Sequence, residues 1–429
     1  MELIQITGGR VLCGSIRPAA AKNSVLPLLA ATLLCGGPSR LRGVPRLRDV
    51  DASLALLRAV GASAQWQGSD LVVQPGEEHE ISGEIPQAQA GAMRASVFYL
   101  APLLCRAGFV ALPLPGGCHL GPRPVDIHLA GLAAMGAQVE LQSDAVVLRR
   151  SAALHAVDFT LRLPSVGATL TLLMAACCAD GTTVLRGTAC EPEIEDTANF
   201  LNACGAHITG AGTPVLIIRG GAALHGCAHT PLPDRIAAAT YAGAVAAAGG
   251  SVCITGCCPA HFATFLQFLQ AAGCTVETGE DCATVTREPG RRLTGGQNLC
   301  AAVYPGFATD AAPLAAAVLL AAHGPSKIYD GLFQNRFACA AGFAAMGADC
   351  SAQGRLLELA GDAKLHGARV QTPDLRGGAA LVLAALGAAG ESQIEDAGHI
   401  GRGYAHLGAD LAALGASCRC REVLLAKHT

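Results

Sequence analysis

The sequence has little charge and few aromatic residues. Of its 429 residues, 15% are Asp, Glu, Lys or Arg and 4% are Phe, Trp or Tyr, and the formal net charge is -3. No basic excess is available to neutralise a nucleic-acid backbone, which argues against a nucleic-acid partner. No stretch combines low hydrophobicity with high charge, so we expect no long disordered tail.

Long apolar runs are also missing. The longest, such as 25–35 and 311–322, are much shorter than the ~20 residues of a membrane-spanning helix, and they contain Pro27 and Pro313. The opening MELIQITGGR has no apolar segment of the kind that directs secretion. We therefore expect a soluble, cytoplasmic protein with no membrane partner.

The sequence has no C-x2-C pair, although it has 19 cysteines. The absence of that spacing argues against zinc fingers and thioredoxin-like sites. Disulfide frameworks belong to small secreted chains, so we expect most of these cysteines to be reduced, buried and apolar in character. Hydrophobic residues make up 51% of the chain, enough for a large core.

An internal repeat organises the chain. A glycine followed by Ala or Cys and a short strand recurs at spacings of 75, 69, 68, 74 and 68 residues. Each glycine ends an amphipathic segment with helical periodicity, as in DASLALLRAV, which predicts a left-handed helix C-cap. These glycines are Gly61, Gly136, Gly205, Gly273, Gly347 and Gly415.

A second helix is expected ahead of each amphipathic one. Segments such as VLPLLAATLLCGG and TLTLLMAACCADG are apolar nearly all round, which predicts buried helices, and each is followed by a short strand such as SRLRGV or TTVLRG. The unit is thus helix, strand, helix, strand, at about 70 residues. Six units predict two lobes of three, with helices inside and sheets around them, and a hinge near 231–235. A cleft between lobes is a common ligand site.

Lys22 is the only lysine in the first 300 residues, at the start of a predicted buried helix. A cation there opposes the positive end of the helix dipole. Either its side chain extends to the surface, or it holds an anion together with the helix N–H groups. We favour the anion site, and no Walker A pattern is present.

Cys118 stands apart from the other cysteines, in the Pro- and Gly-rich segment PLPGGCHLGPRPVDIH, beside His119 and near Arg123. A polar loop with cations favours thiolate character and reactivity, although an inert loop cysteine remains the alternative. Asp126 follows in the same segment, where it could serve only as a helix N-cap.

A further carboxylate and four arginines precede predicted helices. Asp310 in YPGFATD is either an N-cap or a general base, the latter if an anion-rich cleft raises its pKa. A lone arginine is usually a surface group. Four at corresponding places in different repeats predict a clamp for carboxylate or phosphate: Arg94, Arg336, Arg376 and Arg402.

These motifs together resemble the UDP-N-acetylglucosamine 1-carboxyvinyltransferases, a branch of the enolpyruvyl transferase family that also includes the EPSP synthases. The matching segments include AAKNSVLP, MRAS, PGGCHLGPRPVDIHL, SVGATLT, EPEIEDTANFL, YPGFATD, NRF, DLR and RGY. They follow in order from near residue 15 to near residue 410. An EPSP synthase is expected to carry a GSKS-type lysine motif and no PGGC cysteine.

The resemblance implies a two-lobed inside-out α/β barrel of six repeats, three per lobe. One lobe would span 22–232, with the cysteine loop, and the other 1–21 plus 233–429, with the active site in the cleft between them. The implied reaction moves the enolpyruvyl group of phosphoenolpyruvate to the 3′-hydroxyl of UDP-N-acetylglucosamine and releases phosphate, the first committed step of peptidoglycan precursor synthesis. It implies no metal, no organic cofactor and a monomer or weak homo-oligomer.

The resemblance also assigns roles to residues. Cys118 would protonate phosphoenolpyruvate and is the residue that fosfomycin alkylates, and Asp310 would accept the proton of the sugar hydroxyl. Lys22 and Arg402 complete the catalytic group. Phosphoenolpyruvate would be held by Lys22, Arg94, Arg123, Arg336, Arg376 and Arg402. The UDP-sugar would be held by Asn23, Arg94, Arg123, Pro124, Val125, Asp126, Ile127, Ser165, Val166, Gly167, Asp310 and Ile328.

Several positions depart from the family pattern. Leu163 stands where a lysine is common, which removes a contact to the diphosphate and favours an alternative reading, an enolpyruvyl transferase with a different acceptor. Gln334 and Gly401 replace acidic residues and favour another alternative, a degenerate paralogue that binds UDP-sugar with little turnover. Ala237 replaces a further Glu. We favour the active transferase because Lys22, Asn23, Cys118, Arg123, Asp310 and Arg402 are all retained.

Overall fold

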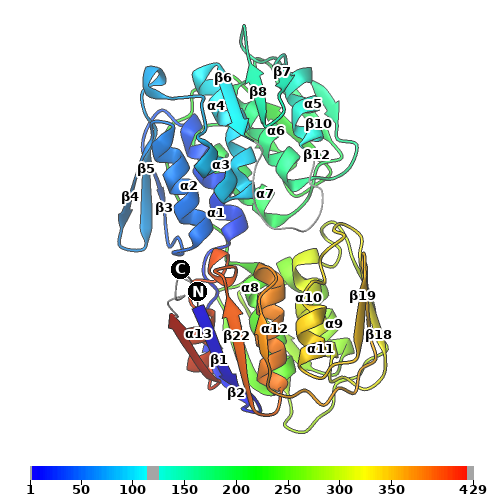
Figure 1. The fold of residues 1–429 in the computed structure, drawn as a ribbon. Coiled ribbons are helices and arrows are strands. Elements are labelled where there is room, and N and C mark those ends of the chain that lie inside the picture. Colours follow the sequence, from blue (N-terminus) through cyan, green and yellow to red (C-terminus); the bar gives the residue numbers. More distant parts are fainter. Residues whose placement is uncertain (1, 114–124, 423–429) are drawn as a thin grey trace. The chain divides into compact units, whose positions relative to one another are not determined.

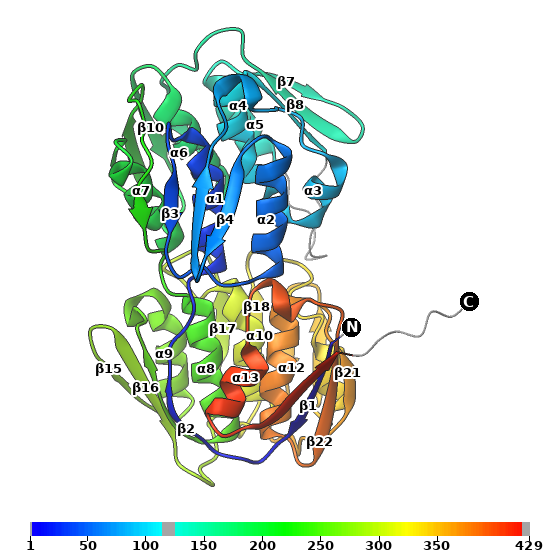
Figure 2. The same ribbon diagram turned by 90° about the vertical axis from the view of Figure 1, so that its left-hand side faces the viewer.

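A computed structural model describes residues 2–113 and 125–422, and it divides into two compact units (Figures 1 and 2). The first, unit N, comprises 20–113 and 125–232. The second, unit C, comprises 2–19 and 233–422. Cys118, Arg123 and Pro124 lie outside the described residues. Among the helices of the described segments, none is long and apolar enough to cross a bilayer.

Six strongly apolar helices form the interior, as the sequence predicts. In unit C the three members contact one another, and in unit N each member is buried over most of its length. Their side chains face other layers on every side, which explains why their sequences are apolar all round. They are α1 (Lys22–Ala31), α4 (Leu100–Ala107) and α6 (Val166–Cys178) in unit N, and α8 (Arg235–Ala248), α10 (Ala312–Leu319) and α12 (Leu375–Gly387) in unit C.

The amphipathic helices also form where predicted, and all six glycines that end them have φ between +91° and +105°. In each case the N–H of the residue that follows the glycine donates to the carbonyl of a buried Leu or Phe five residues back, for example Ala62 N to Leu57 O at 2.9 Å. This is the Schellman arrangement. The helices are α2 (Arg48–Ala59), α5 (Asp126–Ala134), α7 (Pro192–Ala203), α9 (Ala263–Ala271), α11 (Ala340–Ala345) and α13 (Leu407–Ala413).

The strands that follow the two helices of each repeat are confirmed. Those after the buried helix are β3 (Ser39–Leu41), β6 (Phe109–Pro113), β10 (Thr182–Arg186), β14 (Gly250–Thr255), β18 (Ser326–Asp330) and β22 (Glu391–Asp396). Those after the glycine are β4 (Ser63–Gln67), β7 (Gln138–Leu141), β11 (His207–Thr209), β15 (Thr275–Thr278), β19 (Cys350–Gln353) and β23 (Ser417–Glu422).

The repeat contains more strands than the sequence pattern predicted. After the glycine strand the chain turns back and inserts a returning strand between the first two, antiparallel to both. These are β5 (Asp70–Gln74), β8 (Ala145–Arg149), β12 (Val215–Arg219), β16 (Cys282–Arg287) and β20 (Leu356–Leu359). Connecting segments add parallel edge strands, β9 (Asp158–Thr160), β13 (Ala228–His229), β17 (Asn298–Ala301) and β21 (Arg369–Gln371).

The N-terminal residues complete two sheets of unit C. β1 (Glu2–Thr7) lies between β22 and β23, antiparallel to both, in the place that a returning strand takes in the other repeats. β2 (Leu12–Ile16) pairs in parallel with β14 and supplies the edge strand of another sheet. Ile4, Ile6 and Leu12 join the continuous apolar core of this unit. Unit C is therefore built from both ends of the sequence.

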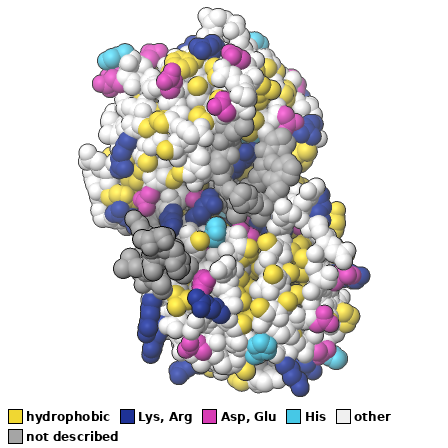
Figure 3. All heavy atoms as spheres, viewed as in Figure 1, with side chains coloured by type: hydrophobic (Ala, Val, Ile, Leu, Met, Phe, Trp, Pro, Cys, Tyr) yellow, Lys and Arg dark blue, Asp and Glu magenta, His cyan; other side chains and the backbone are white. Residues whose placement is uncertain are grey.

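The described residues form six sheets in all, three in each unit, around the buried helices. Strand residues alternate between buried and exposed, as in β12, because one face covers the helices and the other faces solvent. On the face shown in Figure 3, acidic and basic side chains are scattered among uncharged surface. The predicted inside-out α/β architecture is thereby confirmed.

Candidate active site

In unit C, Asp310 lies between two buried arginines. Arg336 Nη2 is 3.1 Å from its Oδ1, and Arg376 Nη2 is 3.2 Å from its Oδ2. Both guanidinium groups are buried, whereas the Asp310 side chain is 28% exposed. Two cationic hydrogen-bond donors therefore flank this carboxyl group.

Asp310 is not an N-cap. It lies in the 3-10 turn η5 (Thr309–Ala311), whose cap is Ala308, and the following α10 is capped by Ala311. The N-cap interpretation of this residue is therefore wrong, and a chemical role stays a prediction. Asp126 is likewise not a cap, because α5 has Val125 at that position.

Arg336 is held by residues that sequence reasoning missed. Its Nε donates to the Thr309 hydroxyl at 3.0 Å and lies 3.7 Å from the fully buried Asp330 carboxylate. Thr309 in turn donates to Asp330, and the guanidinium lies over the Phe333 ring. Asp330 ends β18 in the segment SKIYDG. A carboxylate at the end of a buried strand is the signal that could have identified it.

Arg376 is also held in place by hydrogen bonds. Its Nη1 donates to the Tyr404 hydroxyl at 3.1 Å, and that hydroxyl is 2.7 Å from Thr240 Oγ1 on α8. Burial by itself lowers the pKa of Arg376, but Tyr404, Asp310 and Asp234 outweigh it, so the pKa rises above its usual value. The side chain is therefore a permanent cation. The surface interpretation of a lone arginine is wrong for Arg336 and Arg376.

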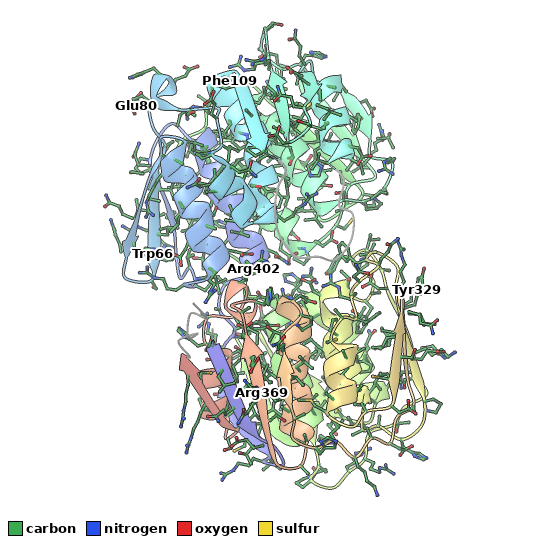
Figure 4. All side chains as sticks on the ribbon, in the orientation of Figure 1. Trp66, Glu80, Phe109, Tyr329, Arg369 and Arg402 are labelled. Atoms are coloured by element: carbon green, nitrogen blue, oxygen red, sulfur yellow. The ribbon has the colours of Figure 1, made fainter. Side chains whose placement is uncertain are left out.

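The N-terminal ends of the buried helices meet at this cluster. Asp234 caps α8 and Asp374 caps α12, each accepting two backbone N–H bonds of 2.8–2.9 Å. Arg402 ends the 3-10 turn η6 (Ile400–Arg402), which packs against the start of α12 (Figure 4). Asp310, Arg376 and Arg402 therefore lie at one end of unit C. Here Ala237 is buried in the first turn of α8.

Unit N also presents its predicted residues at helix starts. Lys22 is the first residue of α1, and its Nζ is 3.1 Å from Asp49 Oδ2 on α2. The two side chains are only 13% and 6% exposed. Lys22 therefore does not extend to the surface. Asp49, in the segment VPRLRDV, is a partner that sequence reasoning missed.

The start of α6 carries the segment predicted to hold the UDP-sugar. Ser165 caps this helix through its hydroxyl, which accepts from Ala168 N at 3.3 Å, and Val166 and Gly167 form the first turn. Arg94 opens the 3-10 segment η3 (Arg94–Tyr99), which contacts both α1 and α6. Asn23, Ser165, Val166, Gly167 and Arg94 are all half-buried.

His128 is a buried residue of this region that sequence reasoning did not single out. It is 5% exposed, and its Nε2 faces Gly167, where an added Cβ would lie only 2.8 Å away. Burial, and then the charge of Arg94, lower its pKa to about 4, against a smaller opposing effect of Asp126. The imidazole is therefore neutral at pH 7.

A cation, Arg162, lies next to Leu163, the position where the family commonly has a lysine. Leu163 is 44% exposed, and its neighbour Arg162 donates to Asp126 Oδ2 at 2.6 Å. Both partners of this ion pair are more than half exposed. Within the predicted stretch 123–127, the structure describes Val125, Asp126 and Ile127. Val125 is half-buried, Asp126 is exposed, and the side chain of Ile127 is buried, which leaves its backbone for contact.

Ile328 lies in β18 opposite Leu357, and its side chain is wholly buried in the core. Its predicted contact with the UDP-sugar stays a prediction. Leu332, which follows that strand, is 39% exposed, and its N–H donates to Asp330 at 2.8 Å. Of the departures from the family pattern, Gln334 is exposed and Gly401 is half-buried.

Comparison with known proteins gives consistent results. A family model described as EPSP synthase (3-phosphoshikimate 1-carboxyvinyltransferase) matches residues 6–411. The chain is 40% identical over 416 residues to UDP-N-acetylglucosamine 1-carboxyvinyltransferase 2 of Caldanaerobacter subterraneus subsp. tengcongensis, covering 97% of this chain and 99% of the relative. It is 39% identical to UDP-N-acetylglucosamine 1-carboxyvinyltransferase of Nitratidesulfovibrio vulgaris, covering 98% and 99%.

Two solved structures are similar to this one. The enolpyruvyl transferase NikO from Streptomyces tendae matches with a TM-score of 0.86 and 26% identity, over 98% of each chain. EPSP synthase from Acinetobacter baumannii matches with a TM-score of 0.72 and 18% identity, over 98% of this chain and all of that one. At that identity the second match supports the fold alone.

Proposed function

Because the chain belongs to the EPSP synthase family of enolpyruvyl transferases, we propose that it transfers the enolpyruvyl group of phosphoenolpyruvate to the 3′-hydroxyl of UDP-N-acetylglucosamine, releasing phosphate. The observation that carries this proposal is the 40% identity, over 97% of the chain, to a relative named for that reaction. The product commits the sugar to peptidoglycan precursor synthesis, a cytoplasmic step that calls for no metal or organic cofactor.

The chemistry accounts for the residue types in the site. The CH2 carbon of phosphoenolpyruvate takes a proton while the sugar oxygen bonds to C2 and loses its own proton. Loss of a proton from the same carbon and departure of phosphate then restore the double bond. We propose that the Cys118 thiol supplies the first proton and that Asp310 accepts the hydroxyl proton. Asp310 is the most exposed member of its cluster, while its two arginines are buried.

The charges of phosphoenolpyruvate need several cations held in place in advance. We propose Lys22, Arg94, Arg123, Arg336, Arg376 and Arg402 for this role. Burial and fixed partners support the assignment, since Lys22, Arg336 and Arg376 have few conformations available to them. For the UDP-sugar we propose Asn23, Arg94, Asp310, Ile328, 123–127 and 165–167.

Phosphate release tests the proposed reaction. The protein is incubated with phosphoenolpyruvate and UDP-N-acetylglucosamine beside Cys118→Ala, with Cys190→Ala in unit N as a control substitution of another cysteine. We expect sugar-dependent release that Cys118→Ala abolishes and Cys190→Ala preserves. Binding of the UDP-sugar without any release would overturn the proposal and leave a degenerate paralogue, which Gln334 and Gly401 favour. Phosphate release that requires another acceptor would favour an enolpyruvyl transferase with a different acceptor, the alternative that Leu163 suggests.

Fosfomycin gives a second test of the cysteine assignment. Mass spectrometry after incubation should find a single adduct, on Cys118. Adducts distributed over several of the other cysteines would contradict the special reactivity proposed for this residue, whatever the outcome of the phosphate assay.

A further inference from the structure

Three cysteines from separate parts of unit N have their sulfur atoms in contact. Cys35 follows the first buried helix, Cys204 lies at the end of α7, and Cys227 immediately precedes β13. Cys204 Sγ is 3.3 Å from Cys227 Sγ and 3.7 Å from Cys35 Sγ. None of the three belongs to the proposed transfer reaction, and all lie within one unit.

The backbone holds these sulfurs in place. Gly36, next to Cys35, donates its N–H to Leu224 O at 2.7 Å. His225 N donates to Cys204 O at 2.9 Å, and Arg40 N donates to Cys227 O at 2.8 Å. Each cysteine is therefore tied to the segment that carries another. The sulfurs of Cys204 and Cys227, 3.3 Å apart as thiols, have to approach to the ~2.05 Å of a disulfide bond.

We propose that Cys204 and Cys227 form a site of reversible disulfide formation, with Cys35 as an exchange partner. A two-electron oxidant such as hydrogen peroxide converts the Cys227 thiol to a sulfenic acid and releases one water. The Cys204 sulfur then bonds to the Cys227 sulfur, and the hydroxyl leaves as a second water with the Cys204 proton. Both thiol sulfurs are oxidised and the peroxide is reduced to two waters.

Accessibility supports these roles. Cys227 is partly exposed, whereas Cys35 and Cys204 are buried, so the oxidant meets Cys227 first. The hydrogen bond to Cys35 raises the pKa of Cys204, and burial raises that of Cys227, so both rest as thiols and lose a proton as they react. The pKa of Cys35 is lowered by its contact with Cys204 and by Ser39 and Arg106, which suits it to attack a disulfide.

A disulfide fits this cluster better than a metal does. Across residues 2–113 and 125–422, no group of three His, Cys, Asp or Glu side chains is arranged to hold a metal ion. The cross-link joins the end of α7 to the start of β13, whose two residues pair with β3. It closes a loop that contains β11 and β12. The inference is independent of the proposed enzymatic reaction.

Peptide mapping of the full-length protein tests the proposal. Trypsin cleaves after Arg219 and so separates Cys204, in peptide 187–219, from Cys227, in peptide 220–235. Cys190 lies in the same peptide as Cys204, so the Cys190→Ser variant is the control that excludes a disulfide formed through Cys190. The protein is treated with hydrogen peroxide, its remaining thiols are alkylated, and the digest is analysed without reduction.

We expect peptides 187–219 and 220–235 to be joined, lighter by two hydrogens than their sum, and to separate on reduction. Cys190→Ser should keep this link, and Cys35→Ser should keep it too. Cys227→Ser should remove the link between these two peptides. Any disulfide that peptide 187–219 still forms should then join it to peptide 23–40, which carries Cys35. Oxidant-treated protein in which Cys204 and Cys227 are both alkylated, or in which Cys227 reaches the sulfinic acid without any link, would overturn the proposal. Circular dichroism checks that each variant is folded.

Discussion

Asp310 balances two buried positive charges, and this sets the expected effect of removing it. Asp310→Asn keeps the shape but leaves Arg376 without its carboxylate partner, while Arg336 retains Asp330. We expect the unfolding free energy of unit C to fall by about 2 kcal/mol or more, because buried charges lose compensation. Urea denaturation followed by circular dichroism measures this.

Asp362→Asn is the control for that variant. Asp362 lies in the same unit and pairs with Arg292 and His323, but its side chain and both partners are exposed. Its denaturation midpoint should stay at the wild-type value, since exposed ion pairs contribute little. Equal losses for the two variants would show that burial of the arginines is not the cause.

His128 makes the stability of unit N depend on pH. Its pKa is about 4 in the folded protein and 6.5 in the unfolded chain, so the unfolded state binds more protons between these values. Stability therefore falls as pH drops from 6.5 to 4 and levels off below, by up to about 3 kcal/mol. The single tryptophan, Trp66, lies in β4 of unit N and reports unfolding by fluorescence.

His128→Gln should remove this part of the pH dependence, whereas His207→Gln, at an exposed position of the same unit, should preserve it. The comparison is made from urea midpoints at pH 7 and pH 4.5. If His128→Gln keeps the pH dependence of stability that the wild-type protein shows, then carboxylates and not His128 cause it.

At the scale of elements, the glycines that end the amphipathic helices differ in their surroundings. Gly61 and Gly205 both have positive φ, at 99° and 105°. A Cβ on Gly61 would lie 2.3 Å from Glu80 O, a backbone atom, whereas on Gly205 the nearest atom, Ala223 O, is 3.5 Å away. The same local motif thus meets two different packing environments.

We expect Gly205→Ala to cost about 1–2 kcal/mol from backbone strain alone. Gly61→Ala should cost about 1–3 kcal/mol more, because the carbonyl of Glu80 must move. Both variants lie in unit N and are compared by urea denaturation with Trp66 fluorescence. Similar losses would mean that the 78–81 segment adjusts without strain.

At the scale of the whole molecule, the N-terminal residues are part of a unit that otherwise begins at residue 233. Deleting residues 1–16 removes β1 from the middle of one sheet and β2 from the edge of another. We expect amides of β22, β23 and β14 to lose hydrogen-exchange protection, while amides of α1, α6 and β10 in unit N keep theirs.

Adding a synthetic peptide of residues 1–19 should restore part of that protection, while a peptide with Ile4 and Ile6 replaced by Asp should not. Both isoleucines are buried in the core of unit C, and charge at these positions opposes insertion. Unchanged protection in the truncated protein would contradict the structural role of β1.

Much of the local structure follows from sequence alone. Apolar runs of helical length, amphipathic periodicity and a glycine at each helix end specify two helices and a cap in every repeat, because these features act within a few residues. The motifs around Lys22, Cys118, Asp310 and Arg402 likewise identified the family, since their spacing along the chain needs no tertiary information.

Tertiary structure decided which residues that are far apart in the sequence come into contact. The returning strands and the place of β1 depend on pairing across the chain, which no local pattern encodes. The same holds for the arginines that flank Asp310, the Lys22–Asp49 pair, the burial of Ile328 and the contact of Cys204 with Cys227. Sequence determined which chemical groups are present, and packing of distant segments determined which of them meet.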